Sequence, residues 1–240
     1  MDRGGDMTGG KLTVRVVLGT VAVCGVAASA VSVASLLSRA TRTAAGDFHG
    51  VAALRLATDF EDVTVTEGAA AGSVSMRRSY SWSLRRPHIG AAVQGNTLRV
   101  SSGCWGIGRP CTGWARLNVP PGTPVTGGGG DGSVTLNGTR GAVDLSMSDG
   151  AVHGTDLRSP TVRVHTADGG VRLEFATAPQ RVDVHTADAG VTVVVPRGVS
   201  WRVTTGTADG GVHVTVPQDP AATRTISVHT ADGSITIANP

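Results

Sequence analysis

Histidine, threonine and aspartate recur together in a short motif in the C-terminal half of the chain. The motif reads VHTADGG at residues 164–170, VHTADAG at 184–190 and VHTADGS at 228–234. An imidazole and a carboxylate this close together are typical of a metal site or an acid–base pair. A repeated structural turn would use the same residue types for hydrogen bonds to its own backbone. The sequence around the motif distinguishes a chemical site from a structural turn.

The aspartate of this motif belongs to a longer series of repeats, and a repeat indicates architecture before it indicates a site. Successive aspartates are separated by 18, 19, 20, 21 and 23 residues, and the extra residues fall between strand-like runs. Insertions at such places are typical of repeat arrays. The six aspartates are Asp131, Asp149, Asp168, Asp188, Asp209 and Asp232.

The runs on either side of each aspartate alternate apolar and polar residues with the period of a β-strand. Val162 and Val164 precede one aspartate on the apolar face, whereas Arg163 between them is polar. A single repeat cannot bury its apolar face alone, so neighbouring repeats must stack. We therefore expect an all-β fold, a parallel β-solenoid of repeats about 20 residues long. An antiparallel meander or sandwich, with each Asp-Gly as a hairpin turn, is the alternative.

Equivalent residues of successive solenoid repeats lie about 4.8 Å apart. His165 and His185 are then neighbours, but Gly206 stands at the equivalent position of the next repeat and His229 comes only after it. We therefore expect the row of histidines to be interrupted. Its members are expected to be exposed surface residues and not metal ligands.

The row of aspartates, in contrast, is uninterrupted. Carboxylates about 4.8 Å apart repel each other by roughly 1 kcal/mol even in water, so another interaction has to offset this repulsion. We expect each aspartate to hold its turn by accepting hydrogen bonds from backbone N–H groups, beside a permissive glycine. Ala189 replaces that glycine in one repeat, so a positive φ is not required there. Binding of a divalent cation such as calcium is the alternative.

Motifs of known catalytic sites are missing from the sequence. It contains no G-x-S-x-G elbow, no H-E-x-x-H, no P-loop and no unique carboxylate pair outside the repeats. A periodic row of carboxylates does not give the distinct environments that an acid and a base need. We expect a protein that is not an enzyme and that uses no cofactor and no catalytic metal.

Basic and aromatic residues are interleaved in the segment between residues 67 and 131, which contains no acidic residue. The segment favours the solvated face of a small sheet with the tryptophans packed inside, and a surface for anionic envelope polymers or lipid headgroups is the alternative. A net charge of +3 is too small to indicate a nucleic-acid partner. The candidate residues of this surface are Arg77, Arg78, Arg85 and Arg86.

Two further features lie close to this basic segment. Cys104 and Cys111 predict a disulfide if the domain is exported to an oxidising compartment, and free thiols if it is not. The glycine-rich stretch TGGGGDGSV at residues 126–134 is followed by a strand-like run and not by a helix. A phosphate cradle requires the helix, so we expect a flexible turn.

The N-terminal part predicts attachment to a membrane. Residues 16–37 are an uncharged stretch of 22 residues, and a helix of that length spans roughly 33 Å, enough to cross a bilayer. A cleavable signal peptide is the alternative. The expected order is a tail (1–15), the anchor (16–37), a linker (38–47), an N-terminal β region (48–125) and the repeats (126–240), the last two forming one continuous domain. Basic residues on both sides of the anchor slightly favour an extracytoplasmic domain.

The membrane segment, the passage NTLRVSSGCWGIGRPCTGWARLNVPPGTPV and the V-x-T-x-D-G-x-V units together resemble the bacterial putative-adhesin family. The resemblance covers residues 48–240. Within the family, the chain is similar to actinobacterial members with a membrane anchor. It implies a β-solenoid exposed on the cell surface that binds a cell-wall polymer or a surface protein without catalysis. A carbohydrate-active β-helix enzyme and an envelope-stress regulator or scaffold are the alternatives. The family carries no binding residues that could be transferred to this chain.

Overall fold

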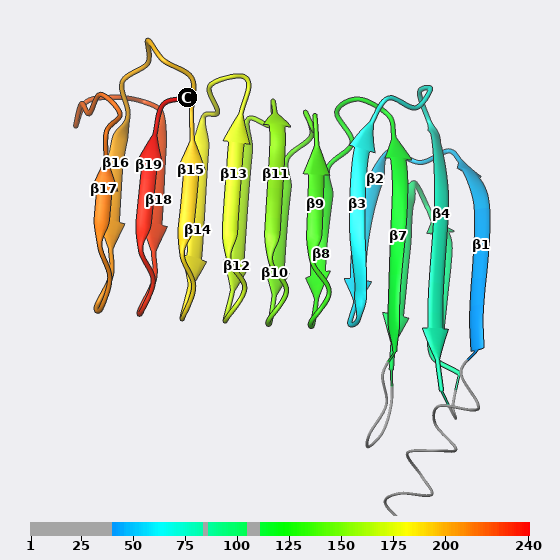
Figure 1. Ribbon diagram of the computed structural model, residues 1–240. Helices are drawn as coiled ribbons and strands as arrows, with labels where there is room; N and C mark the ends of the chain where they lie inside the picture. Colours follow the sequence, from blue (N-terminus) through cyan, green and yellow to red (C-terminus); the bar gives the residue numbers. More distant parts are fainter. Residues whose placement is uncertain (1–39, 84–85, 105–110) are drawn as a thin grey trace, which may run out of the picture.

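The computed structural model describes residues 40–83, 86–104 and 111–240, and the regular structure in these ranges consists of β-strands alone. The strands form two large sheets that face each other along the whole described chain (Figure 1). The expectation of an all-β fold is therefore confirmed. The anchor expected at residues 16–37 lies outside the described ranges, and within those ranges no helix is long and apolar enough to cross a membrane.

The ten-stranded sheet has the order β1 (Ala40–His49), β4 (Ser73–Trp82), β7 (Thr112–Val119), β3 (Glu61–Glu67), β9 (Val134–Asn137), β11 (Val152–Leu157), β13 (Val171–Phe175), β15 (Val191–Val194), β19 (Ile235–Ala238) and β17 (Val212–Val214). The nine-stranded sheet has the order β16 (Arg202–Gly206), β18 (Thr225–His229), β14 (Arg181–Thr186), β12 (Thr161–Thr166), β10 (Val143–Met147), β8 (Val125–Gly129), β2 (Ala53–Thr58), β6 (Thr97–Gly103) and β5 (His88–Gln94).

Each sequence repeat gives one strand to each sheet. We use the term rung for two strands that follow each other in the chain, the first in the nine-stranded sheet and the second in the ten-stranded sheet. β12 and β13 form one rung, and β14 and β15 form the next. Neighbouring rungs pair in parallel and in register, so that Val162 lies beside Val182 and Val171 beside Val191. The two strands of a repeat lie in different sheets, so the hairpin of the alternative meander is not formed.

The core lies between the two sheets and follows the apolar alternation of the sequence. Val162, Val182 and Ile226 are adjacent in register and have no exposed surface. Burying a side chain of this size stabilises the fold by about 1.5–3 kcal/mol. Trp201 is fully buried as well, at the start of the outermost rung. Stacked aliphatic rows therefore hold one rung against the next.

The stack ends in antiparallel strands on the side of the N-terminal region. β1 pairs with β4, β4 with β7, and β5 with β6 in antiparallel register. β1 contains residues 40–47, which were expected to be a linker, so this expectation is wrong. The polar side chains of this segment suit an edge strand, because most of its residues remain exposed while its backbone pairs with β4.

The spatial order of the rungs differs from their order in the chain. The rung β18–β19 lies between β14–β15 and β16–β17, although it follows both in the sequence. At the other end, the rung β2–β3 lies between β6–β7 and β8–β9, although it precedes both in the sequence. Figure 1 shows this exchange as the red β18 and β19 beside the orange strands β16 and β17. At the C-terminal end the chain therefore skips one position after β14–β15 and later returns to fill it with β18–β19.

The first part of the glycine-rich stretch is a strand, where the sequence predicted a flexible turn, and residues 130–132 form a bend. Residues 125–129 form β8, which is paired on one side with β2 and on the other with β10. Gly127 and Gly128 have φ angles of 102° and 148°, which side chains rarely adopt. A β-carbon at Gly127 would lie 2.0 Å from the carbonyl oxygen of Leu56, so glycine lets the rungs approach closely here.

Candidate functional site

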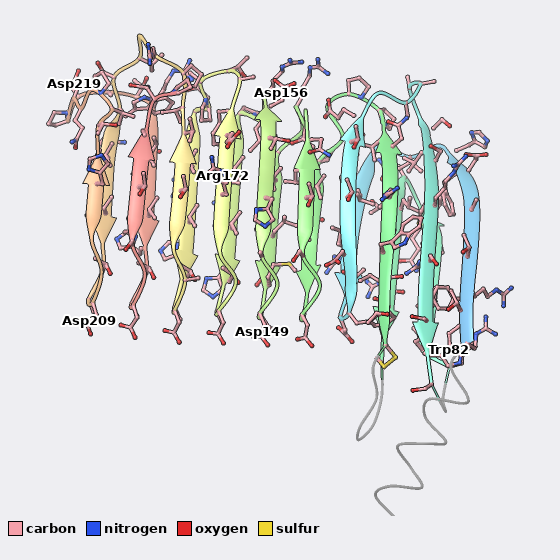
Figure 2. All side chains as sticks on the ribbon, in the orientation of Figure 1. Trp82, Asp149, Asp156, Arg172, Asp209 and Asp219 are labelled. Atoms are coloured by element: carbon pink, nitrogen blue, oxygen red, sulfur yellow. A yellow bond between two sulfur atoms is a disulfide. The ribbon has the colours of Figure 1, made fainter. Side chains whose placement is uncertain are left out.

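The motif of histidine, threonine and aspartate forms the turns along one edge of the stack. All six aspartates of the row are exposed, and Figure 2 shows Asp149 and Asp209 pointing away from the strands at this edge. Within the described ranges, their carboxylates take part in no hydrogen bond and no ion pair. The expectation that these aspartates hold the turns is therefore corrected.

Threonine supplies the hydrogen bonds of these turns. Thr166 is 1% exposed, donates its hydroxyl to the carbonyl of Ser148 at 3.1 Å and accepts the backbone N–H of Gly169 at 3.1 Å. The first bond reaches the neighbouring rung and the second closes the turn itself. Thr186 and Thr230 repeat the bond between rungs at 3.0 and 2.9 Å. The buried threonine hydroxyls therefore stabilise the turns, and the aspartate carboxylates are exposed to solvent.

At Gly150, Gly169 and Gly233 the close spacing of the rungs, and not the φ angle, favours glycine after the aspartate. Gly150, Gly169 and Gly233 are not among the residues with positive φ. A β-carbon at Gly169 would lie 2.1 Å from the carbonyl oxygen of Gly150, on the preceding rung. This agrees with the inference from Ala189 that the turn needs no positive φ.

The histidine row is continuous where the sequence predicted an interruption. His165, His185 and His229 occupy adjacent positions on β12, β14 and β18, because β18 lies next to β14. Gly206 stands beyond His229 and not between the histidines. The prediction failed because it assumed that the rungs follow each other in chain order.

Arg78 is a core residue and not part of a basic surface. Its side chain is 2% exposed and forms two hydrogen bonds to the fully buried carboxylate of Glu61, one from Nε at 3.1 Å and one from Nη2. The guanidinium also donates to the carbonyls of Gly90 and Ser101. These contacts join both sheets near the antiparallel end, and they leave the arginine with no capacity for an external ligand.

The other candidate arginines are placed differently. Arg77 and Arg86 are exposed, while Arg85 lies outside the described residues. Arg77 points outward from β4 and lies opposite Arg116 of β7 in the antiparallel register. Neither side chain forms an ion pair with any described residue. Arg77 is thus exposed on the outer face, and its register partner is Arg116, which is not among the four candidate arginines of the sequence analysis.

A groove of about 620 Å³ surrounds this pair on the outer face of the ten-stranded sheet. Arg77, Arg116, Asn118, Ser75 and Thr66 supply donors along it. The carboxylate of Glu67 also lines the groove, but it is engaged by the guanidinium and the backbone N–H of Arg140 and by the N–H of Gly122. Asp47 of β1 contributes the one exposed carboxylate of this lining.

An aromatic ring extends the groove along β4 and β7. The guanidinium carbon of Arg116 lies 4.7 Å from the ring centre of Trp114, a cation–π contact. Trp114 lines a second hollow of about 270 Å³ together with Ser79, Ser81 and Thr112. Hydroxyl groups, an indole ring and two guanidinium groups thus follow one another on one face. This combination suits polymers that carry both sugar-like and anionic groups.

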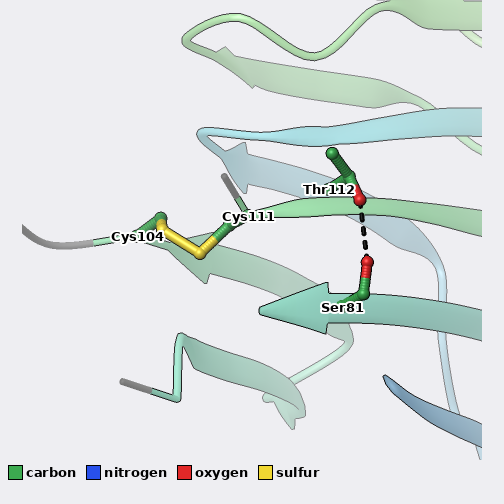
Figure 3. The surroundings of a disulfide bond; sticks show 4 residues. All are labelled: Ser81, Cys104, Cys111 and Thr112. Atoms are coloured by element: carbon green, nitrogen blue, oxygen red, sulfur yellow. Dashed lines mark hydrogen bonds between the residues drawn. A yellow bond between two sulfur atoms is a disulfide. The ribbon is translucent and has the colours of Figure 1, made fainter. Parts of the chain in front are cut away.

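A disulfide joins the two sheets at the same end of the molecule. Cys104 follows β6 of the nine-stranded sheet, Cys111 precedes β7 of the ten-stranded sheet, and their sulfur atoms are bonded (Figure 3). The hydroxyls of Ser81 and Thr112 form a 2.8 Å hydrogen bond beside it. The structure thus contains the disulfide that the sequence predicted for an exported domain.

The sequence matches no known protein family profile and no curated protein. Among solved structures, a "putative cell adhesion protein" from Clostridium sporogenes is similar at 12% identity and a TM-score of 0.48, covering 84% of this chain and 100% of that one. A "putative adhesin" from Bacteroides fragilis is similar at 14% identity and a TM-score of 0.43, covering 83% and 97%. Another from Parabacteroides merdae has 10% identity and a TM-score of 0.31, covering 85% and 96%.

Proposed function

We propose that this chain is a membrane-anchored, extracytoplasmic β-solenoid that binds anionic polymers of the cell envelope without catalysis. The solenoid is supported by the parallel, in-register pairing of successive rungs. A single observation carries the binding function: Arg77 and Arg116 lie side by side, without acidic partners, in a groove that continues to Trp114. The expected contacts are charge-assisted hydrogen bonds to phosphate or carboxylate groups, with Trp114 packing against the uncharged part of the polymer.

The disulfide supports the extracytoplasmic location, because disulfides persist in oxidising compartments and are rare in the cytoplasm. Treatment of intact cells with a protease tests this part of the proposal. An extracytoplasmic domain is degraded under these conditions, whereas protection of the domain until the cells are lysed would contradict the proposed location.

The binding proposal is tested with immobilised poly(glycerol phosphate) as the anionic probe and dextran as the uncharged one. The full chain in detergent is expected to bind the first, with an affinity that falls as salt is added. Replacing both arginines (R77Q/R116Q) removes two charge-assisted contacts, each worth about 1.5–3 kcal/mol at most. We expect a loss of affinity of about 10-fold or more.

The matched control is the double variant R55Q/R99Q. Arg55 and Arg99 are also exposed neighbours in register, but they lie on the nine-stranded sheet, away from Trp114. This variant lowers the net charge by the same amount and is expected to keep nearly all of the affinity. Equal losses in the two double variants would show that overall charge and not the groove determines binding, and would contradict the proposal.

A further inference from the structure

Three imidazole rings are stacked on the outer face of the nine-stranded sheet, on the opposite side of the molecule from the arginine groove. The ring centres of His165 and His185 are 6.4 Å apart, and those of His185 and His229 are 5.1 Å apart with an interplanar angle of 12°. The row exists because the exchanged order of the rungs places β18 directly beside β14.

The inner nitrogens of two rings face polar side chains of the same strands. Nδ1 of His185 lies 3.3 Å from Oδ1 of Asp183, and Nδ1 of His229 lies 3.5 Å from the hydroxyl of Ser227. Asp183 is 9% exposed, and its Oδ1 is buried without a well-formed hydrogen bond. A histidine that is oriented through one nitrogen by a carboxylate presents its other nitrogen as a metal ligand.

The arginines that share β12 and β14 with the row are paired with carboxylates. Arg181 contacts Asp183 at 2.9 Å, and Arg163 contacts Asp144 at 3.0 Å, whereas Arg202 of β16 is exposed without an ion pair among the described residues. Net positive charge would oppose the approach of a metal ion, and on β12 and β14 it is compensated within the sheet. Gly206, on the outer side of His229, has no side chain that would cover the ring.

We propose that this row binds one divalent transition-metal ion of the zinc or copper type through Nε2 of His185 and His229, with His165 as a third ligand. Asp183 and Ser227 act as positioning residues. In the described ranges no three ligating groups already converge on one point, so binding requires the rings to tilt toward each other. Metal–nitrogen distances are about 2.0–2.1 Å, and the side chain of His185, which is 49% exposed, has room to tilt into that geometry.

The proposal is tested by titrating the full chain in detergent with Zn²⁺, Cu²⁺ and Ca²⁺ in competition with a chromophoric chelator. We expect one ion of Zn²⁺ or Cu²⁺ to bind per chain, with Cu²⁺ the tighter of the two, as is general for nitrogen ligands. Ca²⁺ prefers oxygen ligands and is expected not to compete. Competition by Ca²⁺ would place the site at the exposed aspartates and contradict the proposal.

Variants identify the ligands. H185Q and H229Q are each expected to weaken Zn²⁺ binding at least 10-fold. H153Q and H213Q, which remove exposed histidines from the ten-stranded sheet, are the matched controls and are expected to leave it unchanged. Zinc binding that persists in the triple variant H165Q/H185Q/H229Q, or that is absent from the unaltered chain, would overturn the proposal.

Two more variants separate ligation from a general effect on the sheet. Ser146 lies beside His165 in register, so S146H adds a fourth imidazole to the row and is expected to tighten binding. D183N is expected to weaken it by about 10- to 100-fold, as loss of an outer-shell partner generally does. Circular dichroism shows whether D183N keeps its strands, and an intact D183N with unchanged zinc affinity would exclude a positioning role for Asp183.

Discussion

At the scale of single residues, the aspartates of the turns are conspicuous in the sequence, but the threonines contribute more to the hydrogen bonding of the turns. The aspartates recur in every repeat, yet they are exposed and their carboxylates form no hydrogen bond within the described ranges. Thr166, two residues before Asp168, is buried and bonds both to its own turn and to the next rung. Repetition in a sequence therefore identifies the turn but does not identify which side chain stabilises it.

This difference predicts opposite outcomes for two neighbouring substitutions. T166V leaves the N–H of Gly169 without its side-chain acceptor and removes one of the three hydrogen bonds that the carbonyl of Ser148 accepts, which is expected to cost about 1–3 kcal/mol. D168N removes an exposed charge without a partner and is expected to change stability by less than about 0.5 kcal/mol. The free energies of unfolding in urea provide the comparison, and a larger loss in D168N than in T166V would refute this account of the turn.

The arginines show what residue-level reading could have found. Arg77 and Arg78 are consecutive in a strand, and consecutive side chains of a strand point to opposite faces. One of the two therefore had to point inward, and an inward arginine requires a buried acidic partner. The sequence does not name that partner, because Glu61 lies 17 residues away and on a strand whose pairing is set by the fold.

At the scale of elements, strand type and face were predictable and the order of the rungs was not. Alternation of apolar and polar residues fixed both faces of β12 to β15, and parallel stacking followed from the repeats. Every rung, however, presents similar apolar rows to its neighbours, so burial alone does not distinguish chain order from the exchanged order. The connection of residues 215–224 between β17 and β18 is long, which gives the chain room to return across one position.

Cysteine pairs test the exchanged order directly. His213 of β17 and Thr236 of β19 are register partners, about 4.8 Å apart as neighbours in a sheet, so H213C/T236C is expected to form a disulfide. Thr192 of β15 is separated from His213 by the intervening β19, at roughly twice that spacing, which is too far for a disulfide.

Oxidised samples of both double variants are digested with a protease and analysed by mass spectrometry. The cross-link is expected in H213C/T236C and not in T192C/H213C. The reverse result would mean that the rungs follow each other in chain order, and the continuous row of histidines would then not exist.

At the scale of the whole molecule, the two ends of the stack are built differently. One end is closed by antiparallel strands, the buried pair of Arg78 and Glu61, and a disulfide between the sheets. The other end is the rung β16–β17, where Val212 remains 47% exposed. The arginine groove lies near the reinforced end and the histidine row near the open one. A ligand at each site would therefore act on a region of different rigidity.

The open end predicts an unusual response to truncation. β16 pairs with no strand other than β18, and β17 with none other than β19, within the described chain. Deleting residues 225–240 is therefore expected to release two rungs and not one. Hydrogen exchange measured on the truncated chain is expected to show loss of amide protection over residues 202–214 as well. Retained protection there would mean that the outer rung stacks on β14–β15 by itself.

The exchanged rungs also have a consequence for the order in which the chain is made. A growing chain presents β16 and β17 before β18 and β19 exist, so the rung of Asp209 has no permanent neighbour when it emerges. It must either wait with unpaired backbone groups or occupy the place that β18–β19 takes later. In the second case, β18–β19 must displace β16–β17 from the position beside β14–β15 before the final arrangement is reached. Synthesis from the N-terminus onward thus cannot complete this end of the stack one rung at a time.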